Sequence, residues 1–478
     1  MTHPHPPPAA AHHTAPLPPM GRRPWTALTL LCLAQFMLVL DVTVVNVALP
    51  SMAADLDLGR TALTWVVTTY TLCFGGLMLL GGRLADVLGA RRTLLTGLAL
   101  FTVASLVTGL ASDATTLLAG RTAQGIGAAL LSPAALAIVT TSFHGSDRHR
   151  ALGVWAAIGG AGAAFGVLLG GVLTDGPGWE WIFYVNVPIG AALLLALPAV
   201  VPARAPRPAR LDVPGALLVT AGTGALIYGL VAAGDTGWSH PRTLIPVAVA
   251  AALYGVFVAV ERVQRTPLID LAVLRRRPVV VGSYLMLVAT ALLISLFFLG
   301  SVFLQEVRGH SALRTGVLFL PVAVATAVGA HLGGQFVGRV GARATAAVGL
   351  ALAAAGTGLL TGVGPDGSTW AVVAPGMSVA ALGLGSVFVA ATTTALGFID
   401  PEEAGVASGV VNTFHEVGGS VGVAVVSTVA ASGIEGGTSG GFANAFLVCA
   451  IVAAVSTATT FVFVPRGKPQ MTGGPHAH

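Results

Sequence analysis

The chain has 478 residues, of which 55% are hydrophobic and only 9% are charged, and its mean hydropathy is +0.84. Soluble proteins carry about 25% charged residues, and one soluble core could not bury this much apolar surface. An ordinary globular domain is therefore excluded, and the composition indicates a polytopic membrane protein. The net charge of +5 would permit nucleic-acid binding, but the distribution of the arginines along the chain gives it no support.

Both ends of the chain are polar tails. Residues 1–22 are rich in proline, alanine and histidine and cannot build a core, so we predict a disordered cytoplasmic tail, with residues 466–478 as a second one. The tail histidines could bind a metal, but solvated tails explain them better, and we predict no metal site. Arg22 and Arg23 precede the first apolar run as in a signal peptide. That run is too long and lacks a small-residue cleavage site, so we predict a retained helix.

Fourteen apolar segments are long enough to cross a bilayer. They cover residues 25–48, 62–82, 93–112, 114–142, 151–173, 181–201, 213–233, 243–261, 279–304, 314–338, 344–363, 369–397, 404–431 and 442–464. An even number of spans places both termini on one side of the membrane.

The arginine distribution predicts which side that is. Arg121 falls within a span, and four arginines fall in loops opposite the termini: Arg60, Arg242, Arg308 and Arg314. The other 19 of the 24 Arg and Lys residues lie on the same side as the termini. Because cytoplasmic loops are enriched in Arg and Lys, we predict a multi-pass protein of the cell membrane with both termini in the cytoplasm.

One loop pattern occurs twice, 252 residues apart. Gly82–Arg91 follows the second segment, Gly334–Arg343 follows the tenth, and both read G-x-[LF]-x-x-x-x-G-A-R. Such internal symmetry is typical of transporters built from two similar halves. We therefore predict an N-terminal six-helix bundle at 23–202, two inserted transmembrane helices with basic linkers at 203–277, and a C-terminal six-helix bundle at 278–465.

Three charged residues lie inside predicted spans: Asp41, Arg121 and Glu416. A charge in that position costs several kcal/mol in most estimates and usually marks an ion or proton pathway. At 1.5 Å per residue, Asp41 lies about 24 Å into the first span, and Arg121 about 10 Å into its own span from the outer side. The two could pair directly or through water. Glu416 lies near the midplane in the other half of the chain. His415 and His331 are predicted to be packing or hydrogen-bonding residues.

Four stretches together resemble a known family: Asp41–Pro50 (DVTVVNVALP), Gly82–Arg92 (GRLADVLGARR), Arg121–Ala129 (RTAQGIGAA) and Trp179–Gly190 (WEWIFYVNVPIG). In this order they resemble the major facilitator superfamily and, with fourteen spans, its fourteen-helix drug:proton antiporter family. The resemblance covers about residues 22–465. It implies an all-α integral membrane protein with the major facilitator fold, two six-helix bundles plus two inserted helices. It also implies a monomer without enzymatic activity that needs no cofactor beyond a proton gradient.

The loop Gly82–Arg92 is predicted to be a gating loop. Gly82 and Gly89 allow positive φ and close backbone approach, while Arg91 and Arg92 anchor the cytoplasmic face.

The resemblance implies that Asp86 closes the inner side by meeting charges and a helix N-terminus in the other half. The N-terminus near Ala404 is the matching candidate, since the helix dipole favours a negative group there. Val87 and Ala90 stand where the family usually has basic residues, and Gly338 replaces the acid in the second copy. A weaker lock at Asp86 is therefore expected, and a simple loop anchor is the alternative.

The fifth segment resembles the antiporter motif of the family at Gly162, Gly166, Gly170 and Gly171. Small residues let helices pack backbone to backbone, and close packing alone would explain these glycines equally well. Val167 occupies the place of the usual proline, which weakens the inference of strict antiport.

We assign Asp41 and Glu416 to proton or cation coupling, and Arg121 to tuning or relaying at Asp41. Burial favours the protonated form of a carboxylic acid, so such a group can hold a proton until an arriving cation displaces it. A structural buried ion pair is the alternative for each residue.

The predicted function is proton-driven efflux of small lipophilic, cationic drugs or antibiotics across the cytoplasmic membrane by alternating access. A dedicated exporter of one endogenous metabolite or self-made antibiotic is the alternative. A membrane enzyme would need a nucleophile–base pair or a metal-ligand cluster, and the sequence shows neither. A channel would need a repeated pore-lining segment, and a membrane receptor would need a soluble sensing domain for which no loop is long enough.

Overall fold

The computed structural model describes residues 22–143, 145–201, 212–264, 275–363, 369–397 and 404–464. The predicted tails and most of the basic linkers lie outside these ranges. Within them, the chain is helical and contains no strand, which confirms the all-α prediction.

The helices follow the predicted segments in order. The first group comprises α1 (Arg22–Leu56), α2 (Arg60–Leu88), α3 (Ala90–Gly109), α4 (Ala114–Ser142), α5 (Gly145–Asp175), α6 (Trp181–Tyr184) and α7 (Asn186–Val200). The inserted segment forms α8 (Val213–Thr236) and α9 (Pro241–Val263). The last group comprises α11 (Arg277–Val302), η1 (Phe303–Val307), α12 (Ala312–Val340), α13 (Ala342–Leu359), η2 (Leu360–Gly362), η3 (Thr369–Val373), α14 (Ala374–Leu396), α15 (Ala404–Val429), α16 (Ala431–Gly436) and α17 (Ser439–Phe463).

Twelve helices among the described residues are long and apolar enough to cross a membrane. Two further long helices, α5 with 31 residues and α15 with 26, coincide with the predicted fifth and thirteenth segments. The multi-span helical fold is therefore confirmed, while the count of fourteen spans stays a prediction for these two helices.

The first helix is longer than the sequence indicated. It was expected to end at residue 48, but α1 continues past Pro50 to Leu56. Asp41 consequently lies near the middle of a 35-residue helix rather than toward its outer end.

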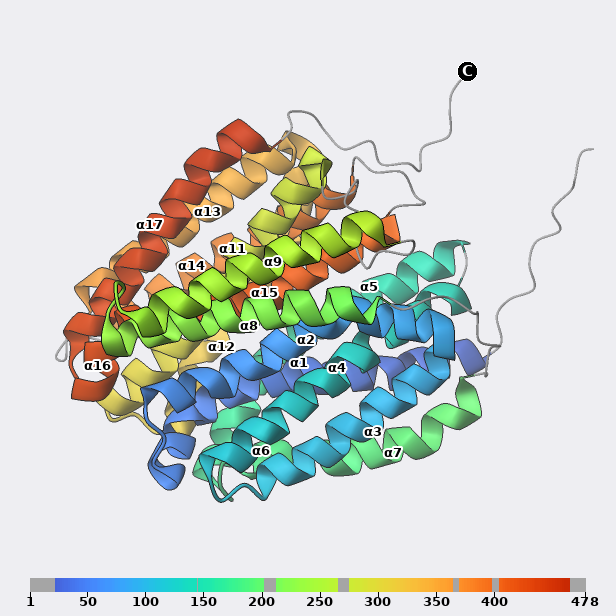
Figure 1. Ribbon diagram of the computed structural model, residues 1–478, viewed down its shortest axis with the longest axis horizontal. Coiled ribbons are helices and arrows are strands. Elements are labelled where there is room, and N and C mark those ends of the chain that lie inside the picture. The colour runs from blue at the N-terminus through green and yellow to red at the C-terminus, as the bar shows by residue number, and fades with distance from the viewer. Residues whose placement is uncertain are drawn as a thin grey trace, which may run out of the picture.

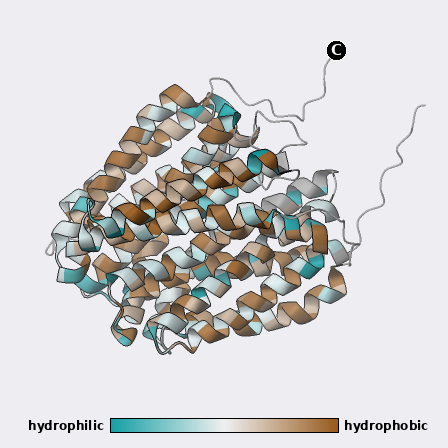
Figure 2. Ribbon diagram, viewed as in Figure 1, coloured by the Kyte–Doolittle hydropathy of each residue, from teal (hydrophilic) through white to brown (hydrophobic). Residues whose placement is uncertain are grey.

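Two groups of helices lie side by side with α8 and α9 beside the seam between them (Figure 1). Across the seam α5 contacts α12, α2 contacts α15, and α1 contacts α11, while α8 contacts both α2 and α15. Hydrophobic residues run along the length of outer helices such as α7 and α17, with hydrophilic residues mainly toward the helix ends (Figure 2). The predicted domain boundaries near 202 and 277 fall in or beside undescribed residues and stay predictions.

The sequence repeat is also a structural repeat. Gly89 joins α2 to α3 with φ 92°, and Gly341 joins α12 to α13 with φ 88°. Both values lie in the region that favours glycine. We call the end of the molecule where α2 meets α3 the Gly89 end, and the opposite end, where α1 ends and α2 begins, the Arg60 end.

Candidate coupling site

Asp41 on α1 and Arg121 on α4 form a buried ion pair. Arg121 Nη1 lies 2.5 Å from Asp41 Oδ2, and each residue is only 1% exposed, so the expected pairing is confirmed as a direct contact. Two amides complete the shell of Asp41. Gln124 Nε2 donates to Oδ1 at 3.1 Å, and Asn186 Nδ2 donates to the same oxygen at 3.4 Å. Because both carboxylate oxygens accept hydrogen bonds, the geometry fits an ionised Asp41.

The rest of the Arg121 guanidinium is held equally firmly. Its Nε donates to the carbonyl of Val66 at 3.1 Å, and Nη1 also donates to Gln124 Oε1 at 3.0 Å. The Tyr70 ring lies beneath it, 4.3 Å from Arg121 Cζ, an arrangement that a cation favours. In this arrangement Asp41 is not accessible to other cations, because a proton or cation can replace Arg121 only after the hydrogen bonds of Arg121 break.

The break between α6 and α7 places Asn186 in this network. Pro188 has no N–H to donate to the carbonyl of Tyr184, so the helical hydrogen bonding is interrupted near Val185. Asn186 is the first residue of α7 and is completely buried.

Glu416 on α15 has a different environment. Its side chain is 15% exposed, and its ionisable neighbour in the described part of the chain is His415, whose Nε2 lies 4.0 Å from Glu416 Oε1. His415 Nδ1 is hydrogen bonded to Thr290 Oγ1 at 2.9 Å, so the predicted hydrogen-bonding role of His415 is confirmed. The His415 ring lies near the acid although adjacent residues on a helix project in different directions. In the described part of the chain Glu416 has no arginine or lysine partner, in contrast to Asp41.

Helix α2 lies between the ion pair and Glu416. It contacts α4 on one side and α15 on the other. At Gly75 the two helices are so close that an added Cβ would lie 2.6 Å from Glu416 Cβ. The structure therefore joins Asp41 with Arg121 but keeps Glu416 apart from both.

The glycines of the antiporter-like motif pack α5 against the Asp41-bearing part of α1. A Cβ added at Gly162 would lie 2.9 Å from Val39 Cγ1, and one at Gly166 would lie 1.8 Å from Thr43 Oγ1. A Cβ at Gly170 would lie 3.0 Å from the carbonyl oxygen of Val44. Gly171 faces α12 instead, where an added Cβ would lie 2.7 Å from the carbonyl oxygen of Ala312. These glycines are thus needed for close helix packing, while any part in antiport stays a prediction.

Of the predicted gating loop, residues 82–88 continue α2 and residues 90–92 begin α3, so Gly89 alone forms the turn between the two helices. Asp86 is exposed and makes no hydrogen bond or ion pair with a described residue, and the side chains at the start of α15, including Ala404, lie outside the description. Gly82 lies inside α2 without a positive φ, and a Cβ added there would be in ordinary van der Waals contact with Pro133 Cβ, at 3.8 Å. Arg91 is half-buried and Arg92 exposed. The lock formed by Asp86 stays a prediction.

The two helix groups are bonded together at the Arg60 end. The buried Arg60 side chain forms ion pairs with Asp235 at the end of α8 and with Glu435 in α16, the latter at 3.2 Å. On the opposite seam, the Asp175 carboxylate at the end of α5 accepts hydrogen bonds from the backbone N–H groups of Ala312 and Leu313, at 3.0 and 2.8 Å. Both seams are therefore closed by charged groups at this end.

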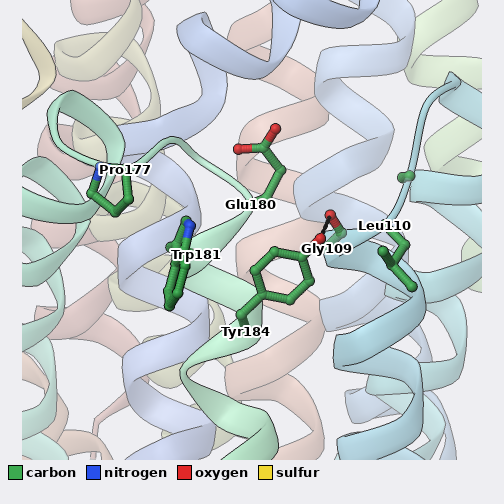
Figure 3. A pocket seen from close by; sticks show the side chains of 7 residues that line it. Gly109, Leu110, Pro177, Glu180, Trp181 and Tyr184 are labelled. Carbon is green, nitrogen blue, oxygen red and sulfur yellow. Dashed lines mark hydrogen bonds between the residues drawn. The ribbon is translucent and has the colours of Figure 1, made fainter.

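A separate open depression of about 340 Å³ lies at the same end (Figure 3). It is lined by Gly109, Leu110, Ala111, Pro177, Glu180, Trp181 and Tyr184. The Tyr184 hydroxyl donates to the carbonyl of Gly109 at 2.6 Å. None of the three intramembrane charges lines this depression, so it is distinct from the coupling site.

Sequence reasoning missed Gln124, Asn186, Tyr70 and the buried position of Arg60. Gln124 and Asn186 are amides inside apolar segments, and both lie in stretches that carry the family resemblance. Their polarity in an apolar segment was the signal that could have placed them near Asp41, since a buried amide needs partners. For Tyr70 and Arg60 no comparable signal exists, because aromatic residues and loop arginines are common at such positions.

The fold defines the class of protein, a polytopic all-α membrane protein made of two packed helix groups with an ion pair sealed inside one of them. The chain belongs to the Major Facilitator Superfamily, whose sequence model matches residues 31–423. It is thus a member of a transporter superfamily.

Curated relatives are similar over most of their length. The chain is 40% identical to the puromycin resistance protein pur8 of Streptomyces alboniger, covering 85% of this chain and 82% of that protein. It is 40% identical to the cephamycin export protein CmcT of Amycolatopsis lactamdurans, covering 85% of each. It is 35% identical to the multidrug resistance protein Stp of Mycobacterium tuberculosis, covering 86% of this chain and 77% of that protein.

Solved structures share the fold at low identity. A bacterial homologue of the human lysosomal transporter Spinster, in an inward-facing and unoccupied conformation, has a TM-score of 0.64 at 17% identity, over 93% of this chain and 98% of that one. An auto-inhibited peptide transporter of the POT family has a TM-score of 0.68 at 16% identity, over 95% of this chain and 99% of that one.

Proposed function

We propose that the protein exports small lipophilic, cationic drugs or antibiotics across the cytoplasmic membrane, driven by the proton gradient. The observation that carries the proposal is the set of relatives named for antibiotic resistance, antibiotic export or multidrug resistance, which are similar over about five-sixths of the chain. The largely buried acid Glu416, without a cationic partner among the described residues, supports coupling to protons.

The proposed cycle uses the two carboxylates differently. Glu416 holds a proton while the site is empty, and a cation arriving from the cytoplasm favours the ionised form and displaces that proton. Asp41 remains paired with Arg121 until the bundles rearrange. Outward release of the cation and reprotonation from outside reset the carrier. Both termini and the Gly89 end face the cytoplasm in this proposal, so the bonds at the Arg60 end close the external side, and the protein works as a monomer without a cofactor.

The test measures ethidium, a fluorescent lipophilic cation, in cells that express the protein. Energised cells are expected to accumulate less ethidium than cells without it, and a protonophore should abolish the difference. The Asp41→Asn and Glu416→Gln variants should reach the membrane but lose this export. Asp113→Asn is the matched control, because it makes the same acid-to-amide change at an exposed residue outside the spans. Undiminished export in both site variants would refute the coupling roles.

A dedicated exporter of one self-made antibiotic is the second candidate. It is favoured by the single-antibiotic names of relatives, such as the cephamycin export protein and the puromycin resistance protein. Cells expressing the protein are compared for accumulation of ethidium, puromycin and lincomycin. Reduced accumulation of several of them supports broad efflux, whereas an effect on one alone supports a dedicated exporter. No effect on any of them argues against efflux of this substrate class.

A further inference from the structure

Tyr70 carries a buried hydroxyl group that the fold leaves unused. Helix α2 also has five threonines, and every one of their hydroxyls is hydrogen bonded: Thr61, Thr64, Thr68, Thr69 and Thr71. The Tyr70 hydroxyl alone on this helix has no partner among the described residues, although the side chain is 0% exposed. A buried hydroxyl without a hydrogen bond is destabilising and calls for an explanation.

The position of Tyr70 supplies one. Its ring lies beneath the Arg121 guanidinium, which is paired with Asp41. Its helix α2 is also the one that touches Glu416, at Gly75. Asp41 lies on α1, Arg121 on α4 and Glu416 on α15, and α2, which carries Tyr70, contacts all three of these helices.

We propose that Tyr70 is a relay residue that passes protons between Glu416 and Asp41, an inference that rests on the proton coupling proposed above. A phenol hydroxyl both donates and accepts a hydrogen bond. As the Glu416 proton bonds to the Tyr70 oxygen, the proton already on that oxygen passes to Asp41. One O–H bond forms and one breaks at the tyrosine, which ends unchanged, while the negative charge moves from Asp41 to Glu416.

In this arrangement the relay is interrupted, and coupling requires such an interruption because a continuous chain of hydrogen bonds would let protons pass without substrate. The hydroxyl is bonded to neither acid, and Arg121 occupies Asp41, so protons cannot leak along a permanent chain. Thr71 of α2 meets Ser420 of α15 through hydroxyls 2.5 Å apart, and Gly75 meets Glu416 through backbone and Cβ contact. Small side chains of this kind allow α15 to shift along α2, and that shift brings the relay into hydrogen-bond contact.

The Tyr70→Phe variant tests the proposal because it keeps the ring beneath Arg121 and removes only the hydroxyl. Wild type and variant are reconstituted in lipid vesicles with ethidium as the probe and a pH-sensitive dye inside. We expect proton-driven ethidium transport to slow about 100-fold, the low end of what a positioned proton-transfer group contributes. Exchange of ethidium without a proton gradient should be unchanged, and the pH profile of the driven rate should be flattened. Thermal stability should be equal to or above that of wild type.

Tyr254→Phe is the matched control, because the Tyr254 hydroxyl on α9 is bonded to Thr223 at 2.9 Å. It should lower stability and leave the pH profile unaltered. A wild-type pH profile and driven rate in Tyr70→Phe would overturn the relay while leaving the proposed function intact. An equal loss of driven transport and gradient-free exchange would show a structural role and also overturn it. Wild-type vesicles that move ethidium without protons would overturn the proposed coupling and the relay together.

Discussion

Replacing Arg121 with methionine tests whether Asp41 is held as a buried anion. Methionine keeps most of the apolar stem but leaves the carboxylate of Asp41, 1% exposed, without its cation. Removing one partner of a buried pair costs about 3–5 kcal/mol, and we expect a loss of that size in the free energy of unfolding. In the double variant Asp41→Asn/Arg121→Met no charge remains, and the new amide can still bond to Gln124 and Asn186. It should therefore be more stable than Arg121→Met by about 2 kcal/mol.

The assay is equilibrium unfolding in mixed micelles with increasing SDS, followed by tryptophan fluorescence. Arg60→Met is the matched control, because its partner acids Asp235 and Glu435 have side chains 43% and 60% exposed and can be hydrated when the arginine is lost. Its loss should stay within about 1 kcal/mol, as for pairs with exposed partners. If Arg121→Met were as stable as wild type, or if the double variant lost the sum of both single losses, Asp41 would not be an anion stabilised by Arg121.

Two further predictions concern packing and pH. Gly166→Ala should destabilise the protein by about 1–3 kcal/mol in the same assay, because its Cβ would lie 1.8 Å from Thr43 Oγ1 and α1 would have to move away from α5. Gly255→Ala is the control and should not destabilise the protein, since no heavy atom lies within 4 Å of a Cβ added there. Equal effects of the two substitutions would contradict the packing argument. Hydrogen bonds from the backbone N–H and hydroxyl of Thr116 lower the pKa of the helix-capping Asp113, so its stabilisation is present above the unfolded value of about 3.9 and is lost only as pH falls through the lower folded value. Hydrogen exchange at the Thr116 amide, corrected for the intrinsic rate, should stay protected down to about pH 4, and loss of protection already near neutral pH would contradict this.

From the sequence, the position of a residue along its helix could be predicted better than the direction in which its side chain points around the helix axis. The fourth segment was predicted at 114–142, and α4 has the same bounds. The helix begins at Ala114 because Asp113 caps its start. Counting residues also placed Asp41 and Arg121 within reach of each other. These helices are apolar on all sides, so no polar face indicates which way a side chain points. The contacts of Gln124, Asn186 and Tyr70 therefore became visible only in the packed structure.

Arg60 was counted among the residues of an outer loop, yet it joins three parts of the molecule. It can hold Asp235 and Glu435 together only while the two helix groups meet at the Arg60 end. Asp235 also accepts a hydrogen bond from Thr61 at 3.1 Å, and Arg60 donates to the carbonyl of Val231 in α8 at 3.4 Å, whereas Glu435 makes only its pair with Arg60 among the described residues. Separation of the groups should therefore break the pair with Glu435 first. Helix α8 is also bonded to the second group, because the Thr428 hydroxyl on α15 donates to the carbonyl of Leu230 in α8 at 2.6 Å. Opening at the Arg60 end would therefore require α8 to release one of the two groups.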